Sequence, residues 1–180
     1  MLRWISQFVL KILGWKIVGD PANELKKKLY IVVPHTSNFD FFLGMLTKWA
    51  TGIKVNFLGK QSLFFPPLGW ILTYYGIVPV KKNSNQIEEI IKLYNSREEM
   101  SYGLAPEGTR SRVEKFRTGF YHIAYGANVP IIMVTFDIGN KVVTFREPYY
   151  VSDDKEKEIA YIQDYYAGVV GFSKKKSYRT

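Results

Sequence analysis

The sequence predicts a single α/β domain with a mostly parallel sheet flanked by helices, plus an N-terminal amphipathic helix. Short apolar runs rich in β-branched residues alternate with stretches of helical spacing, as in parallel strands joined by crossover helices. A length of 180 residues with 47% hydrophobic content suits one compact core. No repeat or linker interrupts the chain. We therefore expect an interfacial helix over residues 1–18 and one folded domain over residues 19–180.

The first seventeen residues predict a basic amphipathic helix lying in a membrane interface. On a helical wheel one stripe holds Arg3, Gln7, Lys11 and Gly14. Apolar and aromatic residues fill most of the rest, namely Trp4, Ile5, Phe8, Val9, Ile12 and Trp15. The run is too short to span a bilayer, and no small-residue cleavage pattern follows it. A helix packed on the core is the alternative, but two tryptophans beside cations favour the interface.

Strands and helices alternate after this segment. Apolar runs predict strands at residues 29–33, 55–58, 77–80, 102–105, 131–136 and 142–146. Capping patterns predict helices that begin near Asp40, near Glu88 and after Asp154, the last one ending before Gly171. The proline- and aromatic-rich residues 64–70 are too irregular to predict one element. The lysines at 174–176 are expected to be disordered or drawn to an anionic surface.

Composition narrows the classes of partner and of chemistry. With 25 Lys and Arg against 16 Asp and Glu, the net charge of +9 favours phospholipid headgroups, nucleic acid or an acidic cofactor as partner. The absence of cysteine excludes disulfides, thiolate metal sites and a cysteine nucleophile. Only two histidines, His35 and His122, are present, so we expect no metal site. His122 lies within an expected helix and is interpreted as a packed or capping residue.

A histidine and an aspartate five residues apart form the first candidate catalytic motif. His35 directly follows the expected strand 29–33, and Asp40 falls in the first turn of the next helix. A tight turn between them can place the carboxylate on the imidazole. The carboxylate then fixes the tautomer, leaving the other ring nitrogen to take a proton from a substrate hydroxyl. In the alternative reading, Asp40 is only a helix cap and His35 a polar residue at a strand end.

A polar, cationic loop forms the second motif. Glu107, Gly108, Thr109 and Arg110 follow an expected strand, at the sheet edge where ligands bind in open α/β folds. Gly108 permits close backbone approach, Thr109 offers a hydroxyl and Arg110 a fork of donors that matches phosphate. An ordinary solvated turn is the alternative. Together the two motifs suggest chemistry on a phosphorylated hydroxyl compound.

Taken in order, these blocks resemble the glycerophospholipid acyltransferase family, whose best-known members are the lysophosphatidic acid acyltransferases. The family's four blocks are matched by residues 35–40, 76–82, 106–110 and 129–132, and Lys60 resembles a family lysine that precedes the second block. Pro34, Pro79 and the pair Lys81 and Lys82 depart from the usual residues. The resemblance covers about residues 28–136.

The resemblance implies transfer of a fatty acyl group from acyl-CoA or acyl-carrier protein, used as co-substrate without a further cofactor. The acceptor would be a lysophospholipid such as 1-acylglycerol-3-phosphate. His35 would act as general base, and Glu107, Gly108, Thr109, Arg110, Lys60 and Lys81 would bind substrate. We expect a peripheral protein on the cytoplasmic face of a membrane, with anionic phospholipid and no nucleic acid as partner. Two alternatives remain: another acceptor, such as a lyso-aminolipid or glycerol phosphate, or a non-enzymatic basic protein that binds membrane or nucleic acid.

Overall fold

The computed structural model describes residues 2–80 and 85–178 and confirms the α/β domain. Its strands are β1 (Lys16–Val18), β2 (Lys27–Val33), β3 (Asn56–Lys60), β4 (Ile77–Val80), β5 (Met100–Leu104), β6 (Ile131–Asp137) and β7 (Val142–Phe145). They form one seven-stranded sheet in the order β1-β7-β6-β2-β5-β3-β4. The strands from β6 to β4 run parallel, whereas β7 is antiparallel to β6 and parallel to β1. The sheet is therefore mostly parallel, as predicted.

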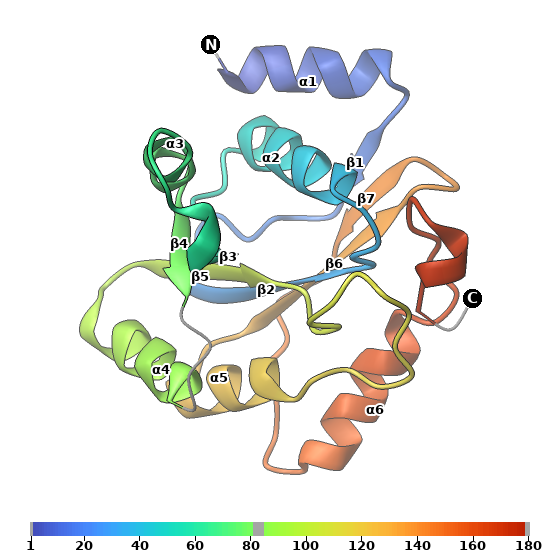
Figure 1. The fold of residues 1–180 in the computed structure, drawn as a ribbon. Coiled ribbons are helices and arrows are strands. Elements are labelled where there is room, and N and C mark those ends of the chain that lie inside the picture. Colours follow the sequence, from blue (N-terminus) through green and yellow to red (C-terminus); the bar gives the residue numbers. More distant parts are fainter. Residues whose placement is uncertain (1, 81–84, 179–180) are drawn as a thin grey trace.

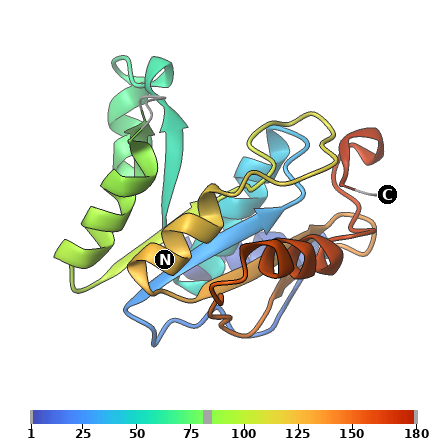
Figure 2. The same ribbon diagram turned by 90° about the horizontal axis from the view of Figure 1, so that it is seen from below.

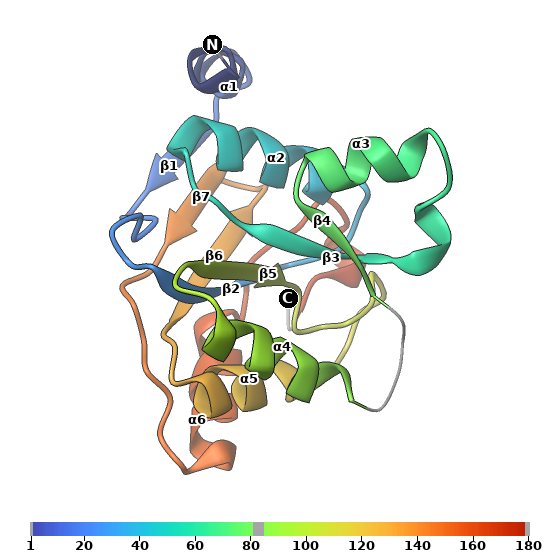
Figure 3. The ribbon, with the colours of Figure 1, turned by 90° about the vertical axis from the view of Figure 1, so that its left-hand side faces the viewer.

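Helices cover both faces of this sheet (Figure 1). One face carries α1 (Leu2–Ile12), α2 (Phe39–Thr51) and α3 (Leu68–Tyr74). The other carries α4 (Gln86–Ser96), α5 (Gly119–Ala127) and α6 (Lys155–Tyr165). Short 3-10 turns are η1 (Gln61–Leu63) and η2 (Lys174–Lys176). Figure 3 shows α1 lying on the outer side of α2, away from the sheet. Within the described residues, no helix has the length and apolar character needed to cross a bilayer.

The central strand β2 is buried on both faces, as its continuous apolar run predicts. Leu29, Ile31 and Val33 belong to the core under α4, α5 and α6, while Tyr30 belongs to the core on the side of α1 and α2. Buried tyrosines satisfy their hydroxyls on this strand, since Tyr166 Oη donates to the Ile31 carbonyl at 2.8 Å. Because β2 is packed between the two cores, its carboxyl end gives the following loop a fixed starting point.

The N-terminal helix is shorter than predicted. It ends at Ile12, because Gly14 takes a left-handed conformation with φ of 77° and turns the chain away. Residues Lys16–Val18 then form edge strand β1, in parallel register with Val142 to Thr144. This strand had no signal in the sequence.

For two other segments the sequence predicted no single element. Residues 64–70, interpreted as irregular, contain the start of α3. The tail of lysines is ordered, because residues 174–176 form η2 and Tyr178 beyond them is fully buried. The Tyr178 ring packs on Phe116 with centroids 4.4 Å apart. Burial of one aromatic side chain thus anchors a segment whose charges alone suggested disorder.

Candidate active site

The two motifs meet at the carboxyl edge of the sheet. Strand β2 leads into His35, and its parallel neighbour β5 leads into the loop that contains Glu107. Because the two strands are paired in register up to Ile31 and Leu104, their following loops leave the sheet side by side. Figure 2 shows the loop after β5 beside the start of α2 at this edge. The fold therefore joins segments about seventy residues apart in the sequence.

His35 and Asp40 form the expected pair. Nδ1 of His35 lies 3.3 Å from Oδ2 of Asp40, and the aspartate is 4% exposed. The same Oδ2 accepts hydrogen bonds from the backbone N–H groups of Thr36 at 2.6 Å and Ser37 at 2.7 Å. Asp40 therefore makes one half of the predicted capping box while it also orients the imidazole. This arrangement favours a proton on Nδ1 and leaves Nε2 as the basic nitrogen.

Arg110 lies directly beside that basic nitrogen. Its Nε donates to His35 Nε2 across 3.4 Å, and the guanidinium is otherwise exposed to solvent. Thr109 is also exposed, and its Oγ1 accepts from the backbone N–H of Ser111 at 3.2 Å. An imidazole nitrogen and a cationic fork therefore share one small surface, an arrangement that suits a ligand with a hydroxyl close to a phosphate.

Glu107 connects the two motifs through a buried hydrogen bond. It is 3% exposed, and its Oε2 accepts a hydrogen bond from the backbone N–H of His35 at 2.7 Å. Burial raises the pKa of Glu107 to about 7; the nearby negative charge of Asp40 adds to the rise, while the hydrogen bond from His35 opposes it. Glu107 thus braces the loop that contains His35.

Gly108 is required where it lies. Its φ is 65°, and a Cβ there would come within 2.5 Å of Arg117 Cδ. The Arg117 backbone N–H donates to the Pro106 carbonyl at 2.8 Å, which holds this second arginine against the turn. Sequence reasoning missed Arg117. The signal was present as a basic run of Arg110, Arg112, Lys115 and Arg117, but nothing local shows which of these folds back on Gly108.

The structure does not bring the other candidate residues into contact with His35 and Asp40 among the residues that it describes. Lys60 is the last residue of β3, which is separated from β2 by β5 alone. Lys81 lies outside the described residues. His122 is exposed on α5, with its ring 5.4 Å from that of Tyr121, and makes no contact with the dyad. Among the described residues, no group of histidine and acidic side chains could hold a metal ion.

Exposed aromatic rings border the dyad. Phe39, at the start of α2, lies 6.3 Å from Phe42 and 5.7 Å from Phe172 between ring centroids. All three are exposed, at 62%, 60% and 42%. They give the polar site an apolar border on the side of α2, which suits a substrate with a polar head and an acyl chain.

Comparison with known proteins gives a family match that covers the residues of both motifs. The acyltransferase family model matches residues 17–137. The chain is 31% identical over 125 residues to the 1-acyl-sn-glycerol-3-phosphate acyltransferase of Escherichia coli strain K12; the match covers 63% of this chain and 48% of that protein. The chain thus spans about half the length of this relative. The crystal structure of the 1-acyl-sn-glycerophosphate acyltransferase PlsC from Thermotoga maritima shares the fold, with a TM-score of 0.64 and 20% identity over 91% of this chain and 74% of that one.

Proposed function

This chain belongs to the acyltransferase family, and from that premise we propose that it transfers a fatty acyl group to the hydroxyl of a lysophospholipid such as 1-acylglycerol-3-phosphate. The donor would be acyl-CoA or acyl-carrier protein. The observation that carries the proposal is the contact of Arg110 Nε with His35 Nε2 at 3.4 Å, between residues 75 positions apart. The Escherichia coli relative acts, by its name, on an acceptor that carries both a hydroxyl and a phosphate.

In the proposed reaction, His35 Nε2 takes the proton of the acceptor hydroxyl while Nδ1–H remains hydrogen-bonded to Asp40. The hydroxyl oxygen attacks the thioester carbonyl carbon, and collapse of the tetrahedral intermediate breaks the carbon–sulfur bond. The thiolate takes the proton back from Nε2. General base action of this kind contributes about 10² to 10⁴ in rate. Direct transfer fits better than a covalent acyl-enzyme, because a chain with no cysteine and no Gly-x-Ser-x-Gly elbow offers no obvious nucleophile for one.

Arg110 has to leave Nε2 before the hydroxyl can bind there. A phosphate on the acceptor would draw Arg110 away from Nε2, because a bidentate pair with two phosphate oxygens is much stronger than one long N–H···N contact. The guanidinium would then hold the phosphate beside the base, and the hydroxyl would take its place on Nε2. An acceptor without phosphate would leave Arg110 where it is.

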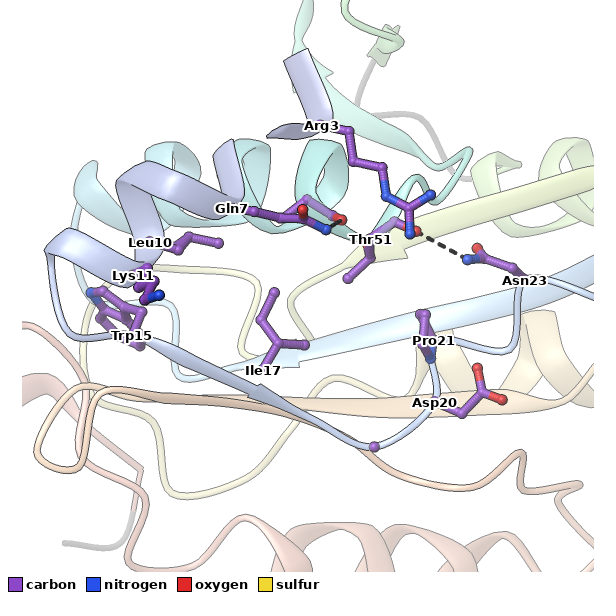
Figure 4. A pocket seen from close by; sticks show the side chains of 12 residues that line it. Arg3, Gln7, Leu10, Lys11, Trp15, Ile17, Asp20, Pro21, Asn23 and Thr51 are labelled. Carbon is purple, nitrogen blue, oxygen red and sulfur yellow. Dashed lines mark hydrogen bonds between the residues drawn. The ribbon is translucent and has the colours of Figure 1, made fainter. Parts of the chain in front are cut away.

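We further propose that α1 binds this enzyme peripherally to the cytoplasmic face of a membrane. Trp4, Phe8 and Ile12 are 77%, 64% and 67% exposed, so the apolar face of α1 does not pack on the core. The polar stripe faces the protein instead: Arg3, Gln7 and Lys11 line a pocket of about 500 Å³ between α1 and the domain (Figure 4). Gln7 donates to the Ala50 carbonyl at 3.0 Å. Such an orientation suits burial of the outward face in lipid.

The direct test is incubation of the purified protein with a panel of lysolipids and both donor types, followed by mass spectrometry of the products. We expect acylation of a phosphate-bearing lysolipid. His35→Ala should lower turnover about 10² to 10⁴-fold and stay folded, because His35 lies at a strand end. Asp40→Asn should also be severe, and circular dichroism of both variants checks that the fold is kept. His122→Ala, on an exposed histidine outside the site, is the matched control and should retain full turnover.

Two outcomes would contradict the proposal. Near-normal turnover of His35→Ala with the same donor and acceptor would remove the base. Acylation confined to acceptors without phosphate would remove Arg110 from acceptor binding and leave the acyl transfer itself in place.

A further inference from the structure

A second exposed apolar surface lies on α3 and the turn before it. We define the α3 surface by its large exposed side chains, Leu63, Phe65, Trp70, Ile71 and Tyr74. Trp70 and Tyr74 are 72% and 82% exposed, among the highest values for large apolar residues in the described chain. No residue from 61 to 76 carries a charge. A cluster of large exposed apolar side chains on an uncharged segment typically marks an interaction site.

Contacts with α2 and within the preceding turn hold the α3 surface in place. Gly69 is buried against the Phe64 backbone, where a Cβ would come within 2.8 Å, so the turn packs tightly on the helix. Lys48 on α2 donates from Nζ to the carbonyls of Val55 and Tyr75, both at 2.8 Å. Trp49 packs on Tyr75 with ring centroids 5.5 Å apart. Inward contacts therefore hold the segment in place while Trp70 and Tyr74 face solvent.

We propose that the α3 surface inserts into the interface of an anionic phospholipid bilayer, as a docking element separate from α1. Tryptophan and tyrosine are the residues typical of membrane interfaces. In the sequence, Lys60 precedes the uncharged segment, and Lys81 and Lys82 follow it, as expected for an anionic surface. The net charge of +9 favours such a surface and opposes a second copy of the chain as occupant.

The position of the α3 surface connects docking with catalysis. Figures 1 and 3 place α1, α2 and α3 on the same side of the sheet. The turn before α3 directly follows β3, which is parallel to β5 and β2, so it begins at the carboxyl edge that also carries His35. Contact of this turn with lipid would bring the catalytic edge to the membrane. The inference rests on the proposed function in this respect, because it supposes an acceptor that resides in the bilayer.

Tryptophan fluorescence tests insertion directly. In the full chain, Trp4→Phe, Trp15→Phe and Trp49→Phe leave Trp70 as the reporter, and Trp4→Phe, Trp15→Phe and Trp70→Phe leave the half-buried Trp49 as matched control. Both proteins are mixed with phosphatidylglycerol vesicles that carry bromine on the acyl chains. We expect Trp70 emission to shift to the blue and to be quenched, and Trp49 emission to change little. Equal responses, or no response of Trp70, would overturn the inference.

A binding comparison completes the test. The double variant Trp70→Glu, Tyr74→Glu should bind phosphatidylglycerol vesicles about tenfold more weakly or worse, because two apolar side chains no longer enter lipid. The control Tyr125→Glu, Tyr150→Glu carries the same charge change on residues outside this surface and should bind within about twofold of the unmodified protein, since no apolar contact with lipid is lost.

Several results would overturn the inference. These are equal binding by the α3 variant and its control, no binding by the unmodified protein, or a dimer lost on α3 substitution while vesicle binding persists. The quenching measurement keeps α3 native, so it decides even where the double variant folds poorly. Neither experiment uses donor or acceptor. Failure here is therefore distinct from failure of acyl transfer on a dispersed acceptor.

Discussion

Oδ2 of Asp40 accepts hydrogen bonds from two backbone N–H groups and also lies 3.3 Å from the imidazole, so one buried oxygen shapes the turn and orients His35. Glu107, from the other motif, fixes the same loop by accepting a hydrogen bond from the His35 backbone N–H. At the scale of single residues, the site consists of two buried carboxylates that hold His35 and exposed cations that face solvent. The two carboxylates fix the position of His35, and the exposed cations remain available to bind an anionic substrate group.

Replacement of Arg110 by lysine tests the cationic half of the site. Lysine keeps the charge but loses the planar fork, so bidentate pairing with phosphate is no longer possible. We expect the KM for the acceptor to rise about tenfold, with a much smaller rise for the acyl donor. Steady-state kinetics with each substrate varied in turn measure the two effects, and Arg97→Lys, on the exposed end of α4, serves as control. Equal rises for both substrates would show that Arg110 does not bind the acceptor phosphate.

Glu107→Gln tests the buried carboxylate through pH. The folded-state pKa of about 7 lies above the ordinary value of 4.5, so the contribution of Glu107 to stability is fully present below pH 4.5 and is lost as pH rises through about 7. Glutamine does not ionise and still accepts from the His35 N–H. The variant should therefore match wild type near about pH 4 and exceed it by about 3 kcal/mol near about pH 8. Chemical denaturation at both values measures this. A difference independent of pH would contradict it.

At the scale of elements, α1 reverses the usual arrangement of a surface helix. Only Ser6 and Leu10 are buried, and they face α2 together with the polar stripe, whereas the aromatic side chains point outward. A helix that packed its apolar face on the core would have gained several kcal/mol from that burial. The sequence of α1 is thus suited to an apolar neighbour that the rest of the described chain does not provide.

Substitution on the outward face of α1 tests this at constant fold. Trp4→Ser with Phe8→Ser should weaken sedimentation with anionic liposomes about tenfold or more and lower activity on bilayer-embedded acceptor, while activity on a dispersed short-chain acceptor stays largely unchanged. The control pair Tyr125→Ser and Tyr150→Ser should sediment like wild type. Substitution is a cleaner test than removal of residues 1–17, which would also remove part of β1. Unfolding of the Trp4 and Phe8 variant would instead show that α1 is a core element.

At the scale of the whole molecule, the segment after α6 returns to support the first motif. The Ser173 backbone N–H donates to Thr36 Oγ1 at 3.2 Å, and Phe172 lies against Phe39. Gly171 packs so closely that a Cβ would come within 2.7 Å of Pro34 and 2.8 Å of Thr36. The loop of the base is therefore enclosed by Glu107 on one side and by this late segment on the other. This segment lies outside residues 17–137, which the acyltransferase family model matches.

Gly171→Ala tests this support. The added methyl group has to displace Pro34 or Thr36, so we expect a loss of about 1–3 kcal/mol in the free energy of unfolding and a fall in kcat larger than any change in KM. Gly139→Ala, in an exposed turn where the nearest atom would be 3.4 Å away, should change stability by less than about 0.5 kcal/mol and leave kcat unaffected. Unchanged stability and kcat in Gly171→Ala would show that the late segment does not position the base.

The sequence by itself determined the elements with strong local patterns and predicted the contact between His35 and Asp40. Strand β4 was predicted at its observed bounds, β2 and β5 within two residues, and the pairing of His35 with Asp40 followed from their spacing across one turn. These features depend on residues near one another in the chain, so periodicity and capping suffice to predict them.

Only the tertiary structure decided the rest. Strand β1 has three residues and exists because β7 pairs with it, and Tyr178 is ordered because Phe116 offers it a buried surface. The contact of Arg110 with His35, the brace from Glu107 and the outward face of α1 depend likewise on residues far apart in the chain. Local propensity cannot determine such contacts, since the energy that selects them comes from burial and pairing in the assembled fold.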